Sequence, residues 1–68
     1  MGEKIVSRLR ELRTQAEMTQ AQIADAVGVT RQTIIAIEKG NYTPSVLLAL
    51  KLARALKVSV EELFDYVA

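Results

Sequence analysis

The stretch TQAQIADAVGVTRQTIIAIEKG, residues 19–40, has the pattern of two short helices joined by a tight turn. Ala24 allows a second helix to approach closely. Gly28, four positions later, can take the left-handed conformation that ends a helix without a Cβ penalty. Apolar residues recur at helical spacing on both sides of this glycine: Ile23, Val27, Val29, Ile34 and Ile37. Together these positions predict two helices that cross steeply at short range.

Side-chain caps mark where both helices begin. Thr19 followed by Gln22 has the form of a capping box, and Thr30 stands just before the next apolar period, where its hydroxyl can accept from free backbone amides. We therefore expect helices over residues 20–27 and 31–39. Two helices in this arrangement are the outline of a helix-turn-helix, a motif that places its second helix in the major groove of DNA.

The second predicted helix has one face turned away from the core. Steps of about 100° per residue from Ile34 place Ile37 on the core side. The opposite side carries Gln32, Ile35, Ala36 and Lys39. We interpret this outward face, together with Arg31 at the start of the helix, as the candidate DNA-reading surface.

The side chains on this face suit the edges of bases. Arginine can donate two hydrogen bonds to guanine O6 and N7, and glutamine can pair with adenine N6 and N7, each match discriminating by about 1–3 kcal/mol. Arg31 and Gln32 are therefore the predicted base readers. Ile35 and Ala36 add an apolar surface whose expected partner is a thymine methyl group.

An amphipathic pattern predicts a first helix over residues 5–16, with Ile5, Leu9, Leu12 and Ala16 on one face. We interpret Arg8 and Arg10, on its other faces, as solvated surface rather than phosphate contacts, because this helix need not lie against DNA. The core predicted for the whole chain is Leu9, Leu12, Ile23, Val27, Ile34, Ile37, Leu52 and Leu56.

A further helix is expected over residues 44–56, because Pro44 fits a first helical position and Thr43 can cap it. Its apolar residues exceed the stripe that one buried face requires, so part of this surface is expected to be exposed in a monomer. It can form a self-complementary patch with the apolar residues near the C-terminus and so close a two-fold dimer. The predicted dimer interface is Leu47, Leu50, Phe64, Tyr66 and Val67. The alternative is a generously filled core in a small protein.

The sequence SVEE, residues 59–62, is a second capping box and predicts a last short helix through Leu63 and Phe64 toward Tyr66. The ending is ambiguous, because Tyr66 and Val67 could extend the helix, fray, or pair with residues 4–6 as a short strand. We favour helix or coil there. The predicted fold class is all-α, a five-helix bundle in one domain over residues 1–68.

Composition limits the classes of function. The 68 residues include neither Cys nor His, which removes disulfides, thiol nucleophiles and the usual soft metal ligands. We expect no catalytic residue, no metal, no cofactor and no small-molecule substrate, because the acidic residues resemble caps and exposed helix faces rather than paired carboxylates in a pocket. No apolar run approaches the roughly 20 residues that span a bilayer, and no signal-peptide core is present, so we expect a cytoplasmic protein without a membrane partner.

Charge is uneven along the chain, whose formal net charge is +1. Residues 1–60 contain nine basic and five acidic residues, a net charge of +4, whereas residues 61–68 contain three acidic residues and no basic one, a net charge of −3. The asymmetry fits a cationic DNA-facing side with an acidic end turned away, although ordinary solvated surface in a short chain has a similar distribution.

Residues 8–64 resemble the phage-repressor and Cro superfamily, in particular the short Xre-like regulators of bacteria and archaea. The matching positions are Thr19-Gln20, Ile23-Ala24, Gly28-Val29, Ile34, Ile37-Glu38, Gly40, Pro44-Ser45, Leu56, Val58 and Leu63. So many positions in register are a strong signal, whereas a lone motif match is weak. The resemblance implies a lambda-repressor-like DNA-binding domain, with its helix-turn-helix at residues 20–39, that regulates transcription.

The resemblance also implies which residues contact DNA. Gln20 matches a glutamine that touches backbone phosphate and braces the reading helix. Arg31, Gln32 and Ala36 match base-reading positions. The expected phosphate contacts are Gln20, Thr30, Thr33, Lys39, Asn41 and Tyr42. Tyr42 could equally pack its ring over the loop that contains it.

Two further positions match scaffold residues of the family, and two depart from it. Arg13 and Glu38 match a pair that ties the first helix to the end of the reading helix. Glu17 stands where many relatives place a glycine or asparagine, so the end of the first helix is expected to be irregular. Ile35 stands where relatives often have serine or asparagine.

These features predict a homodimeric, sequence-specific binder of double-stranded DNA that acts as a repressor by occupying a promoter. A two-fold dimer would present its reading helices about 34 Å apart and require a near-palindromic operator. The alternative is a protein-binding adaptor or antitoxin-like module on the same scaffold, because fold alone does not determine function. Gln20, Arg31 and Gln32, together with the positive body of the chain, favour DNA.

Overall fold

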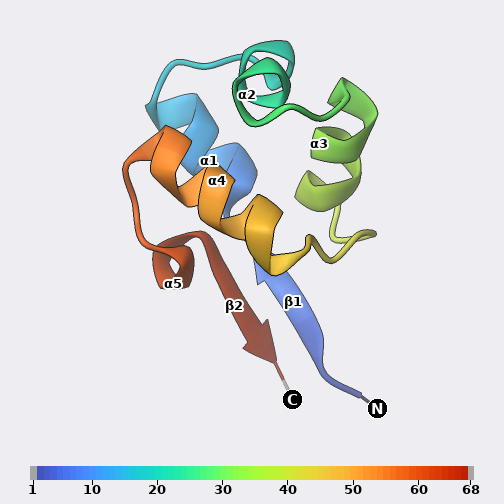
Figure 1. The fold of residues 1–68 in the computed structure, drawn as a ribbon. Coiled ribbons are helices and arrows are strands. Elements are labelled where there is room, and N and C mark those ends of the chain that lie inside the picture. The colour runs from blue at the N-terminus through green and yellow to red at the C-terminus, as the bar shows by residue number, and fades with distance from the viewer. Residues whose placement is uncertain (1, 68) are drawn as a thin grey trace.

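Five helices and two short strands make up residues 2–67, which the computed structural model describes (Figure 1). In chain order they are β1 (Lys4–Ser7), α1 (Leu9–Gln15), α2 (Gln20–Val27), α3 (Arg31–Glu38), α4 (Val46–Leu56), α5 (Val60–Leu63) and β2 (Phe64–Val67). Helix α2 packs against both α3 and α4, and α1 packs against α3. The strands extend away from the helices and bring both ends of the chain to one side (Figure 1). Met1 and Ala68, the ends of the predicted domain, lie outside the described residues.

The predicted helix pair is confirmed together with its caps. The Thr19 hydroxyl accepts from the Gln22 amide at 3.0 Å, and the Gln22 side-chain oxygen accepts from the Thr19 amide at 2.8 Å. Gly28 ends α2 with φ 76°, in the left-handed region. The Thr30 hydroxyl accepts from the Thr33 amide at 3.3 Å and starts α3. Local hydrogen bonds therefore determine where both helices begin.

Aliphatic side chains from all five helices form the core. Its fully buried members are Leu9, Ile23, Ile34, Ile37, Leu52 and Leu63. Of the residues predicted to form the core, Leu12 alone is only partly buried, and it packs against the others. Leu63, in α5, was not among the predicted core residues.

The first and last described elements are strands, so the fold is not purely all-α as predicted, and Tyr66 and Val67 lie in a strand rather than in the helix or coil favoured above. β1 pairs antiparallel with β2, with Ile5 opposite Tyr66 and Ser7 opposite Phe64. The helix expected from residue 5 therefore starts only at Leu9, and the helix expected to pass through Phe64 ends before it. β-branched residues at the start of the chain favour this extended pairing.

The start of α4 differs from the prediction, whereas the irregular end of α1 agrees with it. Helix α4 begins at Val46, because the Ser45 hydroxyl accepts from the Leu48 amide at 3.1 Å, so Ser45 is the cap rather than Thr43. Pro44 consequently precedes the helix instead of opening it. The irregular end expected after α1 is confirmed, since Glu17 has φ 60° in the left-handed region, where a residue with a Cβ is strained.

Candidate nucleic-acid interface

Helix α3 separates a buried face from an outward one, as its periodicity predicts. Ile34 and Ile37 are buried in the core. Arg31 and Gln32 are exposed at its first turn, and the cap residue Lys39 is exposed at its end. The remaining two predicted reading-face residues, Ile35 and Ala36, are partly buried. The outward face is therefore polar at the start of the helix and apolar in its middle.

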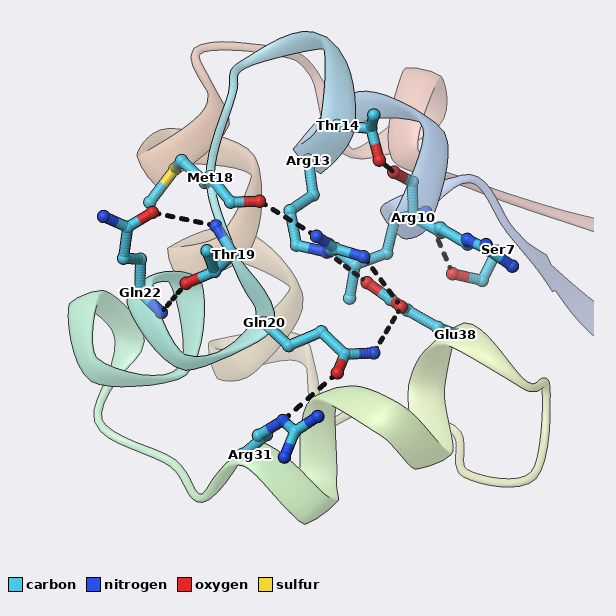
Figure 2. A network of polar contacts seen from close by, with 11 residues as sticks. Ser7, Arg10, Arg13, Thr14, Met18, Thr19, Gln20, Gln22, Arg31 and Glu38 are labelled. Atoms are coloured by element: carbon cyan, nitrogen blue, oxygen red, sulfur yellow. Dashed lines mark hydrogen bonds and ion pairs between the residues drawn. The ribbon is translucent and has the colours of Figure 1, made fainter.

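A chain of hydrogen bonds holds the first residue of this face (Figure 2). Arg31 Nε donates to Gln20 Oε1 at 3.2 Å, and Gln20 Nε2 donates to Glu38 Oε1 at 3.0 Å. Arg31 uses only Nε in this contact, so both of its terminal nitrogens remain available for a planar acceptor such as a base edge. Gln20 thus braces α3 through contacts at both of its ends, as the family resemblance implies.

Glu38 is anchored from the opposite side by α1. Arg13 Nε donates to Glu38 Oε2 at 2.6 Å and Arg13 Nη2 to Oε1 at 3.3 Å, while Arg13 Nη1 donates to the Met18 carbonyl at 2.9 Å. The Arg13 side chain is 13% exposed and that of Glu38 6%. This confirms that the Arg13–Glu38 pair ties α1 to the end of α3.

The surroundings of Glu38 favour its charged form. Burial by itself raises the pKa of this carboxyl, but hydrogen bonds from Arg13 and Gln20 and the positive charges of Arg13 and Arg10 outweigh it, so the pKa is lowered. Arg10 was not predicted to act on this site. Its position three residues before Arg13 on the same helix was the available signal.

The predicted phosphate contacts surround α3. Gln20 is partly buried at the start of α2, and Thr30 and Thr33 lie at the N-terminus of α3. The Thr30 hydroxyl already accepts from the Thr33 amide, so capping occupies one of its lone pairs. Lys39, Asn41 and Tyr42 are exposed after α3. Tyr42 lines a depression shared with β1, which keeps open the alternative that its ring packs locally.

The predicted dimer residues divide into exposed and partly buried ones. Exposed fractions are 64% for Leu47, 48% for Leu50, 63% for Tyr66 and 49% for Val67. Phe64 is partly buried against the core. Val46, 78% exposed beside Leu47 on α4, extends the apolar surface beyond the predicted set.

Comparison with known proteins places these features in a family. The family model for the helix-turn-helix matches residues 9–63. The chain belongs to the helix-turn-helix family of DNA-binding transcriptional regulators.

Relatives of this helix-turn-helix chain occur in archaea and bacteria. It is 53% identical over 57 residues to an uncharacterised HTH-type transcriptional regulator of Methanothermobacter thermautotrophicus, covering 82% of this chain and 83% of that one. It is 35% identical over 57 residues to the cryptic phage CTXphi transcriptional repressor RstR of Vibrio cholerae, covering 84% of this chain and 51% of that one.

A similar solved structure is the restriction-modification controller protein C.AhdI of Aeromonas hydrophila. The TM-score is 0.76 at 38% sequence identity, covering 81% of this chain and 83% of that one.

None of the helices described between residues 2 and 67 has the length and hydrophobicity of a membrane-spanning segment.

Proposed function

We propose that this helix-turn-helix protein is a homodimeric repressor that recognises a near-palindromic operator with α3 in the major groove. The observation that carries the proposal is the bracing of Arg31 by Gln20, which holds an exposed guanidinium at the first turn of α3 with its terminal nitrogens available. A repressor function is supported by the similarity to RstR, which is named a transcriptional repressor. Residues 1–68 act in this proposal as one DNA-binding domain.

Base recognition follows from the chemistry of the outward face. Arg31 pairs with guanine O6 and N7, and Gln32 with adenine N6 and N7, because each side chain matches the donor and acceptor pattern of that base in the major groove. Ile35 is partly buried and presents the rest of its surface outward beside Ala36. These two residues therefore contact a thymine methyl.

Phosphate contacts give the complex its affinity and its orientation. Gln20, Thr30, Thr33, Lys39, Asn41 and Tyr42 supply them from both ends of α3 and from the start of α2. Such contacts release counterions from DNA, so affinity falls steeply as the salt concentration rises. They carry no sequence information directly, which leaves base choice to the outward face of α3.

Dimerisation uses the apolar surface on α4 and the C-terminal strand. Leu47 and Leu50 on α4 are largely exposed, and so are Tyr66 and Val67 on β2. A two-fold contact through these residues, with Phe64 beneath them, removes this apolar area from water. It also sets the distance between the two copies of α3, which the operator spacing must match.

Selection of bound duplexes from a random double-stranded DNA library tests the function. The wild type is expected to enrich a near-palindrome, and Arg31→Ala and Gln32→Ala to lose or relax the preference at one position in each half-site. Arg54→Ala, a change at an exposed arginine on α4, is the control and should select the same sequence as the wild type. Failure of the folded wild type to enrich any sequence would overturn the proposal and favour a protein-binding adaptor.

Two variants test the finer parts of the proposal. Ile35→Ser should lose the preference for thymine at one position, and an unchanged preference would contradict the methyl contact. Leu50→Glu should convert the dimer to a monomer in sedimentation measurements, because it places a charge in the apolar contact. Ala26→Glu introduces the same residue at an exposed apolar position of α2, outside the proposed contact, and it should leave the dimer intact. A monomeric wild type would contradict the dimer.

A further inference from the structure

Arg10 lies at a groove that reaches the outward face of α3. The groove has a volume of about 320 Å³ and lies between α1 and the second half of α3. Its lining residues are Arg10, Arg13, Gln20, Ile35, Glu38 and Lys39. It thus connects two residues predicted to contact DNA from α2 and α3, Gln20 and Ile35, with an arginine on α1.

The charges in this groove leave a positive excess. Glu38 is already engaged by Arg13 on both carboxylate oxygens and by the Gln20 amide. Within residues 2–67, neither Arg10 nor Lys39 forms an ion pair. The groove is therefore lined by two exposed cations without an ion pair, one from α1 and one from the end of α3, and by a single carboxylate, which Arg13 already neutralises.

Arg8 shows the contrast on the same helix. Its guanidinium lies 3.8 Å from the Asp65 carboxylate and donates to the Glu62 carbonyl at 3.5 Å. Arg8 is therefore directed toward α5 and β2, whereas Arg10 lies beside the end of α3. Of the two arginines at the start of α1, only Arg10 combines lack of an ion pair with proximity to Lys39.

We propose that Arg10, expected from the sequence to be solvated surface, instead contacts a DNA phosphate next to the one that Lys39 meets, so that α1 joins the DNA interface. The inference rests on the proposed function, in which α3 lies in the major groove and Lys39 meets the phosphate backbone. Two neighbouring phosphates on that side face the groove between α1 and α3, so that Arg10 meets one and Lys39 the other. The contact orients the protein on DNA and has no base preference of its own.

The dependence of affinity on salt tests this contact. Arg10→Gln should lower the slope of log K against log salt by about 0.9 for each phosphate that the protein no longer neutralises. Between about 50 and 200 mM salt, its affinity deficit relative to wild type should therefore shrink by about 3.5-fold per protomer, or about 12-fold for a dimer. The selected sequence should not change. Arg10→Lys, which keeps the charge, should retain most of the wild-type slope.

Arg54→Gln removes the same charge from α4, outside the groove, and serves as the control. Arg10→Gln with the slope of this control would overturn the proposal. So would a lowered melting temperature with an unchanged slope, because that result assigns Arg10 only to stabilising the negative end of α3. A wild type that selects no DNA sequence would instead refute the proposed function, and this proposal with it.

Discussion

Removal of Arg13 tests whether the buried ion pair holds α1 and α3 together. Arg13→Met keeps most of the side-chain length and a similar helix propensity, but leaves the Glu38 carboxylate with one side-chain donor, the Gln20 amide. The Glu38 side chain is only 6% exposed, so the unpaired charge is poorly hydrated. Breaking a buried pair in this way costs several kcal/mol of folding stability.

The expected magnitude follows from the interactions that the substitution removes. Arg13 also donates to the Met18 carbonyl at 2.9 Å, a hydrogen bond worth about 1 kcal/mol. We expect a total cost of about 3 kcal/mol, toward the low end for buried pairs because the Gln20 amide still donates to Glu38. For a chain of this size such a cost lowers the melting temperature by about 12–24 °C.

A double-mutant cycle separates the pair from other effects. Glu38→Gln preserves the shape and should cost about 1.5 kcal/mol, while the double variant should cost about 3 kcal/mol, a coupling of about 1.5 kcal/mol. The measurement is urea unfolding at pH 7 and constant protein concentration, because dimerisation would couple stability to concentration. Arg54→Met, at an exposed position, is the matched control. A coupling near zero, or Arg13→Met as stable as Arg54→Met, would refute the reasoning.

Three further predictions concern stability. Because folding lowers the pKa of Glu38 from its ordinary 4.5, this carboxylate takes up a proton at a higher pH in the unfolded chain than in the folded protein. The folding stability that the charged Glu38 contributes should thus be lost from about pH 4.5 down through the folded-state pKa. Glu38→Gln should flatten this loss of stability in urea unfolding measured at a series of pH values. Lys57 ends α4 with φ 60°, so Lys57→Gly should stabilise by about 0.5 kcal/mol in thermal unfolding, whereas Gly28→Ala, at φ 76°, should destabilise by about 1 kcal/mol. Ser59→Ala should lower stability by about 1 kcal/mol through loss of its capping box, and an unchanged melting temperature would contradict that role.

The elements that sequence predicts well are those determined by short-range contacts. The capping box at Thr19, the left-handed Gly28 and the cap at Thr30 each act within a few residues, and the structure shows all three. The boundary at α4 was predicted wrongly, because Thr43 and Ser45 both carry a capping hydroxyl close to the proline. Backbone geometry selects Ser45.

The terminal strands depend on contacts that a local pattern does not contain. Ile5 continues the helical spacing of Leu9 and Leu12, and on that spacing alone it belongs to a helix. Its actual environment is set by Tyr66, its partner across the sheet near the other end of the chain. A backbone hydrogen bond also joins these two parts of the chain, since the Arg8 amide donates to the Leu63 carbonyl at 2.9 Å. Distant pairing therefore overrides the local periodicity.

At the site, periodicity predicts which residues face outward but not how they are held. The exposure of Arg31 and Gln32 follows from the helical repeat, whereas the contact between Arg31 and Gln20 depends on the crossing of two helices. The position of Arg10 beside Lys39 depends likewise on how α1 packs against α3. The packing of the helices against one another therefore determines which cations lie close together, and the pattern of a single helix does not show it.

The side-chain amide of Gln20 links the scaffold to the proposed reading face, and both of its ends constrain its orientation (Figure 2). Its nitrogen faces the Glu38 carboxylate and its oxygen faces Arg31 Nε. A flipped amide would direct an oxygen at the carboxylate and N–H groups at the guanidinium, which is unfavourable at both ends. The charge on Glu38 thus determines how Gln20 meets Arg31. A change at Glu38, which lies at the far end of α3, therefore reaches the end of that helix that is proposed to read bases through a single side chain.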